Sequence, residues 1–331
     1  MKKIGIIGFG AVCENAHVPA MKKLSSLIKP VCVFDLDQAR CERARELLGV
    51  NAYTGIDEMF EKESLDMVVI TTPPSTHKDI IIKSLKNGMD VLSEKPLCVS
   101  LKEFDEISDA VYSTGRIVYT VHNWLYSEHM LKIFSLLNDI GDIKHISWKT
   151  LRKKPSVSAS SNWRVDPKIS GGGIIFDHGW HVIYLMSEML KKKFKYVNSG
   201  FLFNEKAVDE IADIQIISEN YATVDIHLSW HSPIRKNTML IYGIKGVLLF
   251  DDDRITISYD SEKQFEYMFN EKLSGSSSHP EWTEYVYSDF LNAIIDRSKF
   301  EKNFEQSREC LKIITLAYKN YEQRKNKVLS D

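Results

Sequence analysis

The sequence predicts an α/β protein with a doubly wound parallel sheet, joined to a C-terminal α+β domain with a large, open, mostly antiparallel sheet. Short apolar runs alternate with helix-like segments up to about residue 121, and a glycine-rich turn follows the first run. Beyond residue 122, strand-like segments follow one another with only short turns between them. Alternating strands and helices form parallel sheets covered on both faces. We therefore expect a Rossmann-type domain at 1–121 and a second domain at 122–331.

The first half carries five strand-like runs with helices between them. Helix-boundary chemistry supports two of the helices: Asp37 precedes one that ends at Gly49, and Ser100 with Glu103 forms a capping box before another. The expected strands lie at 3–9, 30–35, 65–72, 90–94 and 116–121. The expected helices lie at 19–27, 37–49, 75–88 and 100–115.

The second half begins with a helix-like segment at 128–141 and an alternating strand at 143–151. A helix is expected over 174–192, and two more close the chain at 281–297 and 304–323. Short turns between alternating strands indicate an antiparallel meander. Its expected strands lie at 195–203, 213–219, 222–230, 237–244, 246–251, 254–260 and 264–269.

Composition narrows the function classes. A formal charge of −2 gives no electrostatic footprint for nucleic acid, and no apolar run reaches the length that spans a membrane. The five cysteines show no CxxC spacing, which argues against a disulfide framework or a structural zinc site and predicts a reducing, cytoplasmic location. Residues 1–17 could form a short secretory signal, but three glycines interrupt the apolar stretch and no cleavage site follows, so we expect a buried first strand.

The turn after the first strand has the pattern of a dinucleotide loop. Gly8 allows a tight turn, and Gly10 lets the backbone approach a pyrophosphate at the N-terminus of the next helix. The third position, usually a small residue, is Cys13. Asp35 ends the second strand, where a carboxylate would bind the ribose hydroxyls and repel a 2′-phosphate. The sequence therefore predicts NAD rather than NADP.

Two further motifs follow strands of the same sheet, at the edge where ligands of such sheets bind. TTPPSTH (71–77) stiffens the loop after the third strand. In SEKPL (93–97), Pro96 restricts Lys95 and makes a cis peptide bond accessible, and the ammonium could point into the cofactor site. A helix-starting turn and a solvated surface lysine are the alternative interpretations.

The segment SGGGIIFDHGWHVI (170–183) is the main candidate for chemistry in the second half. Its glycines permit close backbone approach, and a helix follows. Asp177 and His181 lie four residues apart, on one face of an α-helix, while His178 points elsewhere. The residues alone leave three hypotheses open: acid/base catalysis, a metal cluster, and a structural helix cap with packed histidines.

GFGAV, VFDLD, TTPPSTH, SEKP, NWR and GGGIIFDHGWH, in this order and at these spacings, resemble the glucose–fructose oxidoreductase/inositol dehydrogenase (Gfo/Idh/MocA) family. The resemblance implies that Lys95 bonds the reacting hydroxyl, that Asp177 orients the substrate and that His181 is the general acid/base, with no metal. It implies cofactor contacts from Gly8, Phe9, Gly10, Ala11, Val12, Asp35, Thr72, Pro73, His77, Glu94 and Lys95. We expect substrate contacts from Asn123, Trp163, Arg164 and His181, and further ones from Trp230 and His231.

The chain departs from the family pattern at Cys13 and at Leu125, where relatives often carry an arginine. A substrate anion could instead meet the basic loop that follows residue 151, unless that loop is merely a solvated charge run. The basic residues of this loop are Arg152, Lys153, Lys154, Arg164 and Lys168.

The resemblance implies an NAD-dependent dehydrogenase that acts on a secondary hydroxyl of a sugar, cyclitol or sugar derivative, free, phosphorylated or nucleotide-linked. It also implies a homodimer or homotetramer formed through the open sheet. Two alternatives remain. Tightly held NAD could cycle within a lyase or hydrolase reaction without net oxidation, or the protein could be a non-catalytic sensor of NAD(H).

Overall fold

In the computed structural model, the chain forms two compact units. The structure describes the chain except for residues 156–162, 260–262, 277 and 329–331. The first unit comprises Met1–Asn123 and Ser278–Arg308, and the second comprises Trp124–Ser277 and Glu309–Asp331.

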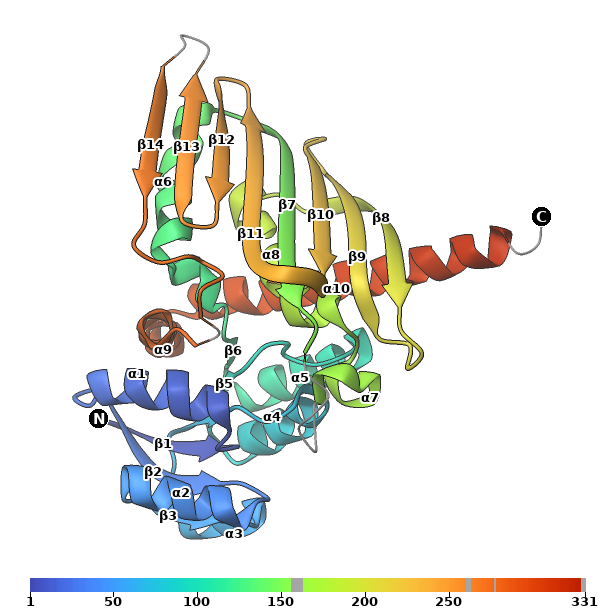
Figure 1. Ribbon diagram of the computed structural model, residues 1–331. Coiled ribbons are helices and arrows are strands. Elements are labelled where there is room, and N and C mark those ends of the chain that lie inside the picture. The colour runs from blue at the N-terminus through green and yellow to red at the C-terminus, as the bar shows by residue number, and fades with distance from the viewer. Residues whose placement is uncertain (156–162, 260–262, 277, 329–331) are drawn as a thin grey trace. The chain divides into compact units, whose positions relative to one another are not determined.

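A six-stranded parallel sheet forms the centre of the first unit (Figure 1), with the strand order β3-β2-β1-β4-β5-β6. Its strands are β1 (Lys2–Ile7), β2 (Ile28–Phe34), β3 (Asn51–Tyr53), β4 (Met67–Ile70), β5 (Asp90–Ser93) and β6 (Val118–Thr120). Its helices up to residue 123 are η1 (Cys13–His17), α1 (Val18–Lys23), α2 (Gln38–Leu48), α3 (Ile56–Lys62), η2 (Pro74–Thr76), α4 (His77–Lys86) and α5 (Leu101–Thr114). The order reverses beside β1, so ligands are expected at the carboxyl ends of β1 and β4.

The capping chemistry that the sequence predicts is present in this unit. The Asp37 side chain accepts a hydrogen bond from the backbone N–H of Ala39, and Gly49 ends α2 with a φ of 64°. The Ser100 hydroxyl accepts from the backbone N–H of Glu103 at the start of α5. The predicted parallel domain is therefore confirmed at the level of its sheet and of these helix ends.

Residues 278–308 belong to the first unit, whereas the sequence prediction placed all of 122–331 in the second domain. They form α9 (Pro280–Ile295) and the first turns of α10 (Arg297–Val328). The Asn303 side chain accepts from the backbone N–H of Thr120 at 2.7 Å and donates to its carbonyl oxygen at 3.0 Å. Because β6 is an edge strand, this amide supplies the pairing that a further strand would give. An apolar helix pattern does not reveal which sheet it will cover.

The second unit is built on an eight-stranded sheet with the order β14-β13-β12-β11-β7-β10-β9-β8. All neighbours are antiparallel except β7 and β10, so the predicted, mostly antiparallel sheet is confirmed. Its strands are β7 (Ile143–Lys153), β8 (Phe194–Phe203), β9 (Asp209–Ser218), β10 (Thr223–Ser229), β11 (His231–Gly243), β12 (Gly246–Asp251), β13 (Arg254–Tyr259) and β14 (Gln264–Met268). The helical segments before β8 are η3 (Asn123–Tyr126), α6 (Glu128–Ile140), η4 (Trp163–Val165), α7 (Pro167–Ser170), η5 (Ile175–Gly179) and α8 (Trp180–Leu190).

One face of this sheet packs against helices and the other is open. Along β9, Ile214 and Ile216 are buried, whereas Asp213 and Gln215 between them are exposed. Helices α6 and α8 lie on the same side of the sheet in Figure 1. Alternation of this kind is what an antiparallel sheet with a single covered face requires.

All five cysteines are free and buried. In the parts of the chain that the structure describes, no helix combines the length and the apolar character needed to cross a membrane.

Candidate active site

The glycine loop closes tightly after β1. Gly8 has a φ of +89°, and a Cβ at this position would lie 2.8 Å from Cγ2 of Thr72 and 3.0 Å from its backbone nitrogen. Only glycine suits both constraints. The helix that follows begins at Ala11 and passes through the π-helical turn η1. Its N-terminal N–H groups are the donors that suit a pyrophosphate.

Cys13 occupies the third position of the glycine motif and is the first residue of the π-helical turn η1. Its side chain is completely buried, and burial raises the pKa of its thiol to about 12. The residue is therefore a small, neutral packing group at physiological pH.

Asp35 lies where the sequence prediction expects a ribose-binding carboxylate, at the end of β2. One carboxylate oxygen accepts from the backbone N–H of Phe9 at 2.7 Å, and the other accepts from that of Asp37 at 2.9 Å. The guanidinium of Arg40 lies 3.7 Å from the first oxygen and is half exposed. The carboxylate is thus fixed against the glycine loop, and the donor and acceptor groups present fit a nicotinamide dinucleotide, NAD or NADP.

The loops after β4 and β5 are tied to each other and to the glycine loop. The Thr71 hydroxyl donates to the carbonyl oxygen of Gly8 at 2.5 Å. The ring nitrogens of His77 lie 2.8 Å from the carbonyl oxygens of Thr72 and Pro96. His77 is completely buried, and this burial lowers its pKa against the effect of the two backbone bonds. Its observed role is to join these loops, which frame the predicted cofactor edge.

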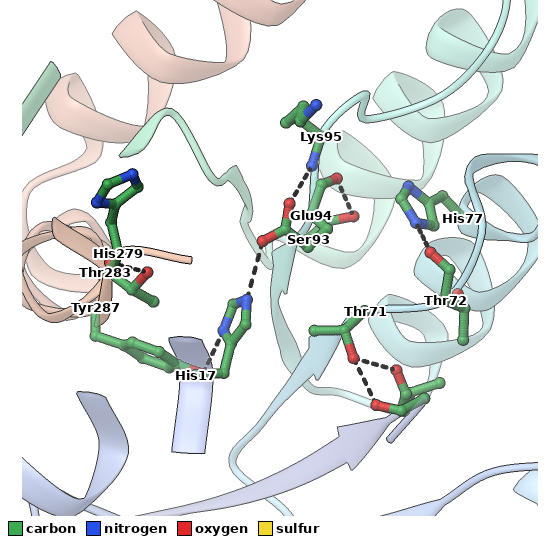
Figure 2. Close-up of polar contacts among 12 residues, drawn as sticks. His17, Thr71, Thr72, His77, Ser93, Glu94, Lys95, His279, Thr283 and Tyr287 are labelled. Carbon is green, nitrogen blue, oxygen red and sulfur yellow. Dashed lines mark hydrogen bonds and ion pairs between the residues drawn. The ribbon is translucent and has the colours of Figure 1, made fainter. Parts of the chain in front are cut away.

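Lys95 follows β5 directly, and its peptide bond to Pro96 is cis. Its backbone N–H donates to one oxygen of Glu94 at 3.1 Å, and the other oxygen of Glu94 lies 3.0 Å from Nε2 of His17. Nδ1 of His17 in turn lies 3.0 Å from the hydroxyl of Tyr287, and Figure 2 shows this chain of contacts. Three segments of the first unit, namely η1, the loop after β5 and α9, therefore meet through the side chains of His17, Glu94 and Tyr287.

The electrostatics of Glu94 depend on this chain of contacts. Burial by itself would raise the pKa of Glu94, but the hydrogen bond and charge of His17 hold it below its ordinary value. His17 is completely buried and the Glu94 side chain is only 14% exposed. Sequence reasoning missed His17 and Tyr287. The histidine in the helix after the glycine loop was an available indication, but no pattern links it to a residue 270 positions away.

We expect His17→Ala to lower the free energy of unfolding by about 3 kcal/mol, because the buried carboxylate of Glu94 then loses its ion-pair partner. Glu94→Gln should cost clearly less in the His17→Ala background than in the wild type, since the uncompensated charge is then removed. Urea denaturation of the four proteins measures both quantities. Equal costs of Glu94→Gln in the two backgrounds would show that the pair is not coupled.

Asp177 and His181 come from two different helical segments of the second unit. Asp177 lies in the π-helical turn η5, where the N–H of Trp180 bonds the carbonyl of Ile175, and His181 lies in α8. The segment around Asp177 is therefore a π-turn, closed by a bond from residue i+5, rather than the regular α-helix that was expected. That Asp177 and His181 lie on one face stays a prediction. His178, predicted to point elsewhere, has its Nε2 3.6 Å from the Asp177 carboxylate.

His181 is held by aromatic neighbours. Its ring stacks on that of Trp124, with centroids 4.6 Å apart and planes at 9°. Nδ1 of His181 lies 2.9 Å from the hydroxyl oxygen of Tyr184, which also accepts from the backbone N–H of Trp124 at 3.1 Å. His181 is 6% exposed and Tyr184 is completely buried. Trp124 and Tyr184 were not predicted from the sequence, which indicated only Asn123, the residue before Trp124.

Trp163 and Arg164, both predicted to contact substrate, lie together beside Asp177. The Arg164 guanidinium lies over the indole of Trp163 at 4.4 Å, and its Nε is 3.9 Å from the Asp177 carboxylate. Such a cation over an indole face is a favourable contact. The structure therefore joins three of the predicted residues in one cluster of the second unit.

Two of the five basic residues predicted to meet a substrate anion, Arg152 and Lys154, already bind other protein groups. Arg152 is buried and donates to the carbonyl oxygens of Leu151 and Lys236. Lys154 lies 2.5 Å from Glu210, which is also 2.6 Å from Nε2 of His231. Burial would raise the pKa of Glu210, but these two partners and a hydrogen bond from Asn204 lower it to about 2. Part of the loop, residues 156–162, lies outside the described residues.

His231 therefore contacts a carboxylate while its side chain stays 45% exposed, whereas Trp230 beside it is buried.

The glycines before η5 make room for protein atoms. A Cβ on Gly172 would overlap the Tyr318 hydroxyl, and one on Gly173 would overlap the backbone of Asp209. The Asp209 carboxylate accepts from the N–H groups of Gly173 at 2.6 Å and Ile175 at 2.9 Å, and from the Tyr318 hydroxyl at 2.5 Å. Burial raises the pKa of Asp209 to about 6 against these bonds. The helix cap considered for this motif exists, but Asp209 of β9 provides it.

Among the described residues, no three side chains of His, Cys, Asp or Glu gather in an arrangement that could hold a metal ion.

Two family models match this chain. Residues 2–122 match the model described as the oxidoreductase family with an NAD-binding Rossmann fold, and residues 137–249 match the GFO/IDH/MocA C-terminal domain. The protein is therefore an oxidoreductase of the NAD(P)-binding class. It belongs to the glucose–fructose oxidoreductase/inositol dehydrogenase (GFO/IDH/MocA) family, as its motifs predict.

Individual relatives are distant. A glucose-6-phosphate 3-dehydrogenase of Bacillus subtilis is 25% identical over 229 residues, which cover 68% of this chain and 63% of that protein. A 2,7-anhydro-N-acetylneuraminate hydratase of Mediterraneibacter gnavus is 24% identical over 266 residues, 76% of this chain and 68% of that one. The crystal structure of a 3-ketoreductase from Actinomadura kijaniata, in complex with NADP and TDP-benzene, matches with a TM-score of 0.83 at 16% identity, covering 96% of this chain and 97% of that one. This last likeness shows the shared fold.

Proposed function

We propose that the protein is an NAD-dependent dehydrogenase that acts on a secondary hydroxyl, or the corresponding ketone, of a sugar, cyclitol or sugar derivative. The observation that carries the proposal is the position of Lys95 at the carboxyl end of β5, at the same sheet edge as a glycine loop and a carboxylate that fit a dinucleotide. Ligands of open parallel sheets bind at this edge. The named activity of the Bacillus subtilis relative, a sugar-phosphate dehydrogenase, supports the substrate class.

In this proposal three residues act on the substrate. The Lys95 ammonium donates to the reacting oxygen and stabilises negative charge that develops there. His181 takes the hydroxyl proton during oxidation and returns it during reduction, a task that suits an imidazole near neutral pH. Asp177, held beside Arg164, orients the substrate. Bound nicotinamide would supply the hydride acceptor.

NAD is the proposed cofactor, because Asp35 places a carboxylate against the glycine loop where it would repel a 2′-phosphate. Arg40 favours NADP instead, since its half-exposed guanidinium lies beside Asp35 and could attract the 2′-phosphate. The two residues predict opposite preferences, and binding measurements distinguish them.

We expect NADH to bind at least about 10-fold more tightly than NADPH, a difference of about 1.4 kcal/mol. Arg40→Ala should leave NADH affinity within about threefold and widen the difference. Arg43→Ala is the matched control, because the guanidinium of Arg43 is bound to Glu14 at 2.6 Å. Isothermal titration calorimetry measures the affinities of the wild type, Arg40→Ala and Arg43→Ala for NADH and NADPH. Tighter binding of NADPH, lost in Arg40→Ala, would reverse the proposed preference.

The reaction itself is tested by absorbance of reduced nicotinamide. Purified protein with NAD or NADP would be mixed with free sugars, inositols, sugar phosphates and sugar nucleotides. A rise with one substrate group supports the dehydrogenase. Product formation without net NADH would instead support a redox-neutral hydratase or lyase, which the named activity of the Mediterraneibacter gnavus relative favours as the second candidate. Saturable NAD binding with no product from any compound would favour a sensor.

Two further parts of the proposal concern the state of the protein in the cell. We propose a homodimer or homotetramer formed through the open face of the second unit's sheet, where Tyr242 and Leu249 are each 44% exposed. The five free, buried thiols support a reducing compartment.

A further inference from the structure

We propose that Tyr184 is a positioning residue that keeps the Nδ1 atom of His181 protonated, so that only Nε2 exchanges a proton with the substrate. This inference deepens the proposed function and rests on it for the catalytic role of His181. The structural part, a single tautomer of His181 set by Tyr184, can be measured without a substrate.

The contacts that carry the inference all lie within the second unit. Tyr184 follows His181 by three residues on α8, and its hydroxyl oxygen lies 2.9 Å from Nδ1. The same oxygen accepts a hydrogen bond from the backbone N–H of Trp124, in η3, at 3.1 Å. The Trp124 ring lies flat on the imidazole at 4.6 Å. Position, plane and partner of the imidazole are thus fixed by two residues.

The direction of the bond between His181 and Tyr184 follows from the chemistry of its donors. A backbone N–H can only donate, so the Trp124 contact uses one acceptor site of the Tyr184 oxygen and orients it. A phenol oxygen can accept a second bond, from Nδ1–H, or donate its own proton to a bare Nδ1. In the second arrangement neutral His181 carries its proton on Nε2, and Nε2 cannot then accept one.

Only the first arrangement allows His181 to act as a base. During oxidation the hydroxyl proton would move to bare Nε2 and bound nicotinamide would accept hydride from the alcohol carbon. A carbonyl group, reduced nicotinamide and an imidazolium would result. Throughout this step Nδ1 keeps its proton and its bond to Tyr184. The hydroxyl therefore need not rotate during turnover, and the reverse reduction uses the same contacts.

Stacking on Trp124 supports the same assignment. A ring held within 9° of the indole plane is confined to that plane, and within it the contact with the Tyr184 oxygen selects the orientation in which Nδ1 faces Tyr184. The electron-rich indole face also favours the positively charged form of the imidazole once it has taken the proton.

The test is the tautomer of His181, measured by long-range nitrogen–carbon-proton correlation spectra of protein labelled with 15N-histidine, at about pH 8, above the ordinary histidine pKa. The chain has 10 histidines, and His181→Asn identifies the resonances of His181 by their loss. We expect the wild-type protein to show the Nδ1–H tautomer. Predominance of the Nε2–H tautomer in the wild type would overturn the inference, and this result needs no variant.

Tyr184→Phe removes the hydroxyl and keeps the ring. We expect a mixture of the two tautomers and a kcat about 10-fold lower with KM nearly unchanged, because one oriented hydrogen bond is lost. Tyr112→Phe, at an exposed position on α5, is the control and should change neither. A tautomer unaffected by Tyr184→Phe also overturns the inference. The Nδ1–H tautomer in a protein that oxidises no substrate would count against the proposed function alone.

Discussion

Replacement of Lys95 by alanine is expected to lower turnover by about three orders of magnitude while NAD affinity changes by less than about threefold. The expected loss is that of a positioned cation that stabilises charge on the reacting oxygen. NAD affinity should persist because most of the contacts expected with the dinucleotide, including those of the glycine loop and Asp35, do not involve the Lys95 side chain. Steady-state kinetics and calorimetry measure the two quantities separately.

Lys62→Ala is the matched control for this prediction. Lys62 is an exposed lysine of the same unit, paired with Glu58 one turn away, and its loss should leave turnover unchanged. Lys95→Met adds a second comparison, since it keeps most of the side-chain length without the charge. Parallel losses of turnover and NAD affinity in Lys95→Ala would mean that the residue is structural and that its proposed role is wrong.

Gly173→Ala is expected to destabilise the protein by about 3 kcal/mol or more and to lower activity in the protein that still folds. A single added methyl group would overlap the backbone of Asp209, which cannot yield as the end of a flexible side chain could. Relief requires Asp209 to move away from the N–H groups of Gly173 and Ile175, which removes the cap of the turn that carries Asp177. Thermal and urea unfolding measure the loss.

Gly200→Ala is the comparison that isolates the steric cause. Gly200 lies in β8 of the same unit, and a Cβ there would meet no atom within 4 Å. We expect it to be neutral or slightly stabilising, since glycine within a strand is itself unfavourable. If both variants lost the same stability, the close approach of Gly173 to Asp209 would not be the reason.

The fold could be predicted wherever local patterns were strong. The caps at Asp37 and Ser100 and the apolar runs of β1, β4 and β5 each give a clear local pattern. The short strand β3 and helix α3 were missed. Residues of β3 are half-buried or exposed, and α3 buries only Met59, so neither has an apolar face that could be recognised. Only pairing with β2 establishes β3 as a strand.

The site could be predicted only as far as its motifs reach. Gly8, Asp35 and Lys95 follow strands, and that position alone identifies the sheet edge they occupy. Their supporting residues come from distant segments, such as Tyr287 behind His17, and no local pattern encodes such a pairing. The π-turn at Asp177 was missed for a similar reason, because Asp209, which caps it, lies on another element.

The division of the chain between the two units has a consequence for biosynthesis. The first unit includes Ser278–Arg308, and the second resumes at Glu309 within the same helix, α10. While a ribosome is still making β8 to β14, β6 lacks the amide of Asn303, and His17 lacks Tyr287. The second unit still awaits Tyr318, which supports the Asp209 cap. Both units are therefore completed only by segments that are translated after β14, and a nascent chain that stalls before α9 leaves both units without these contacts.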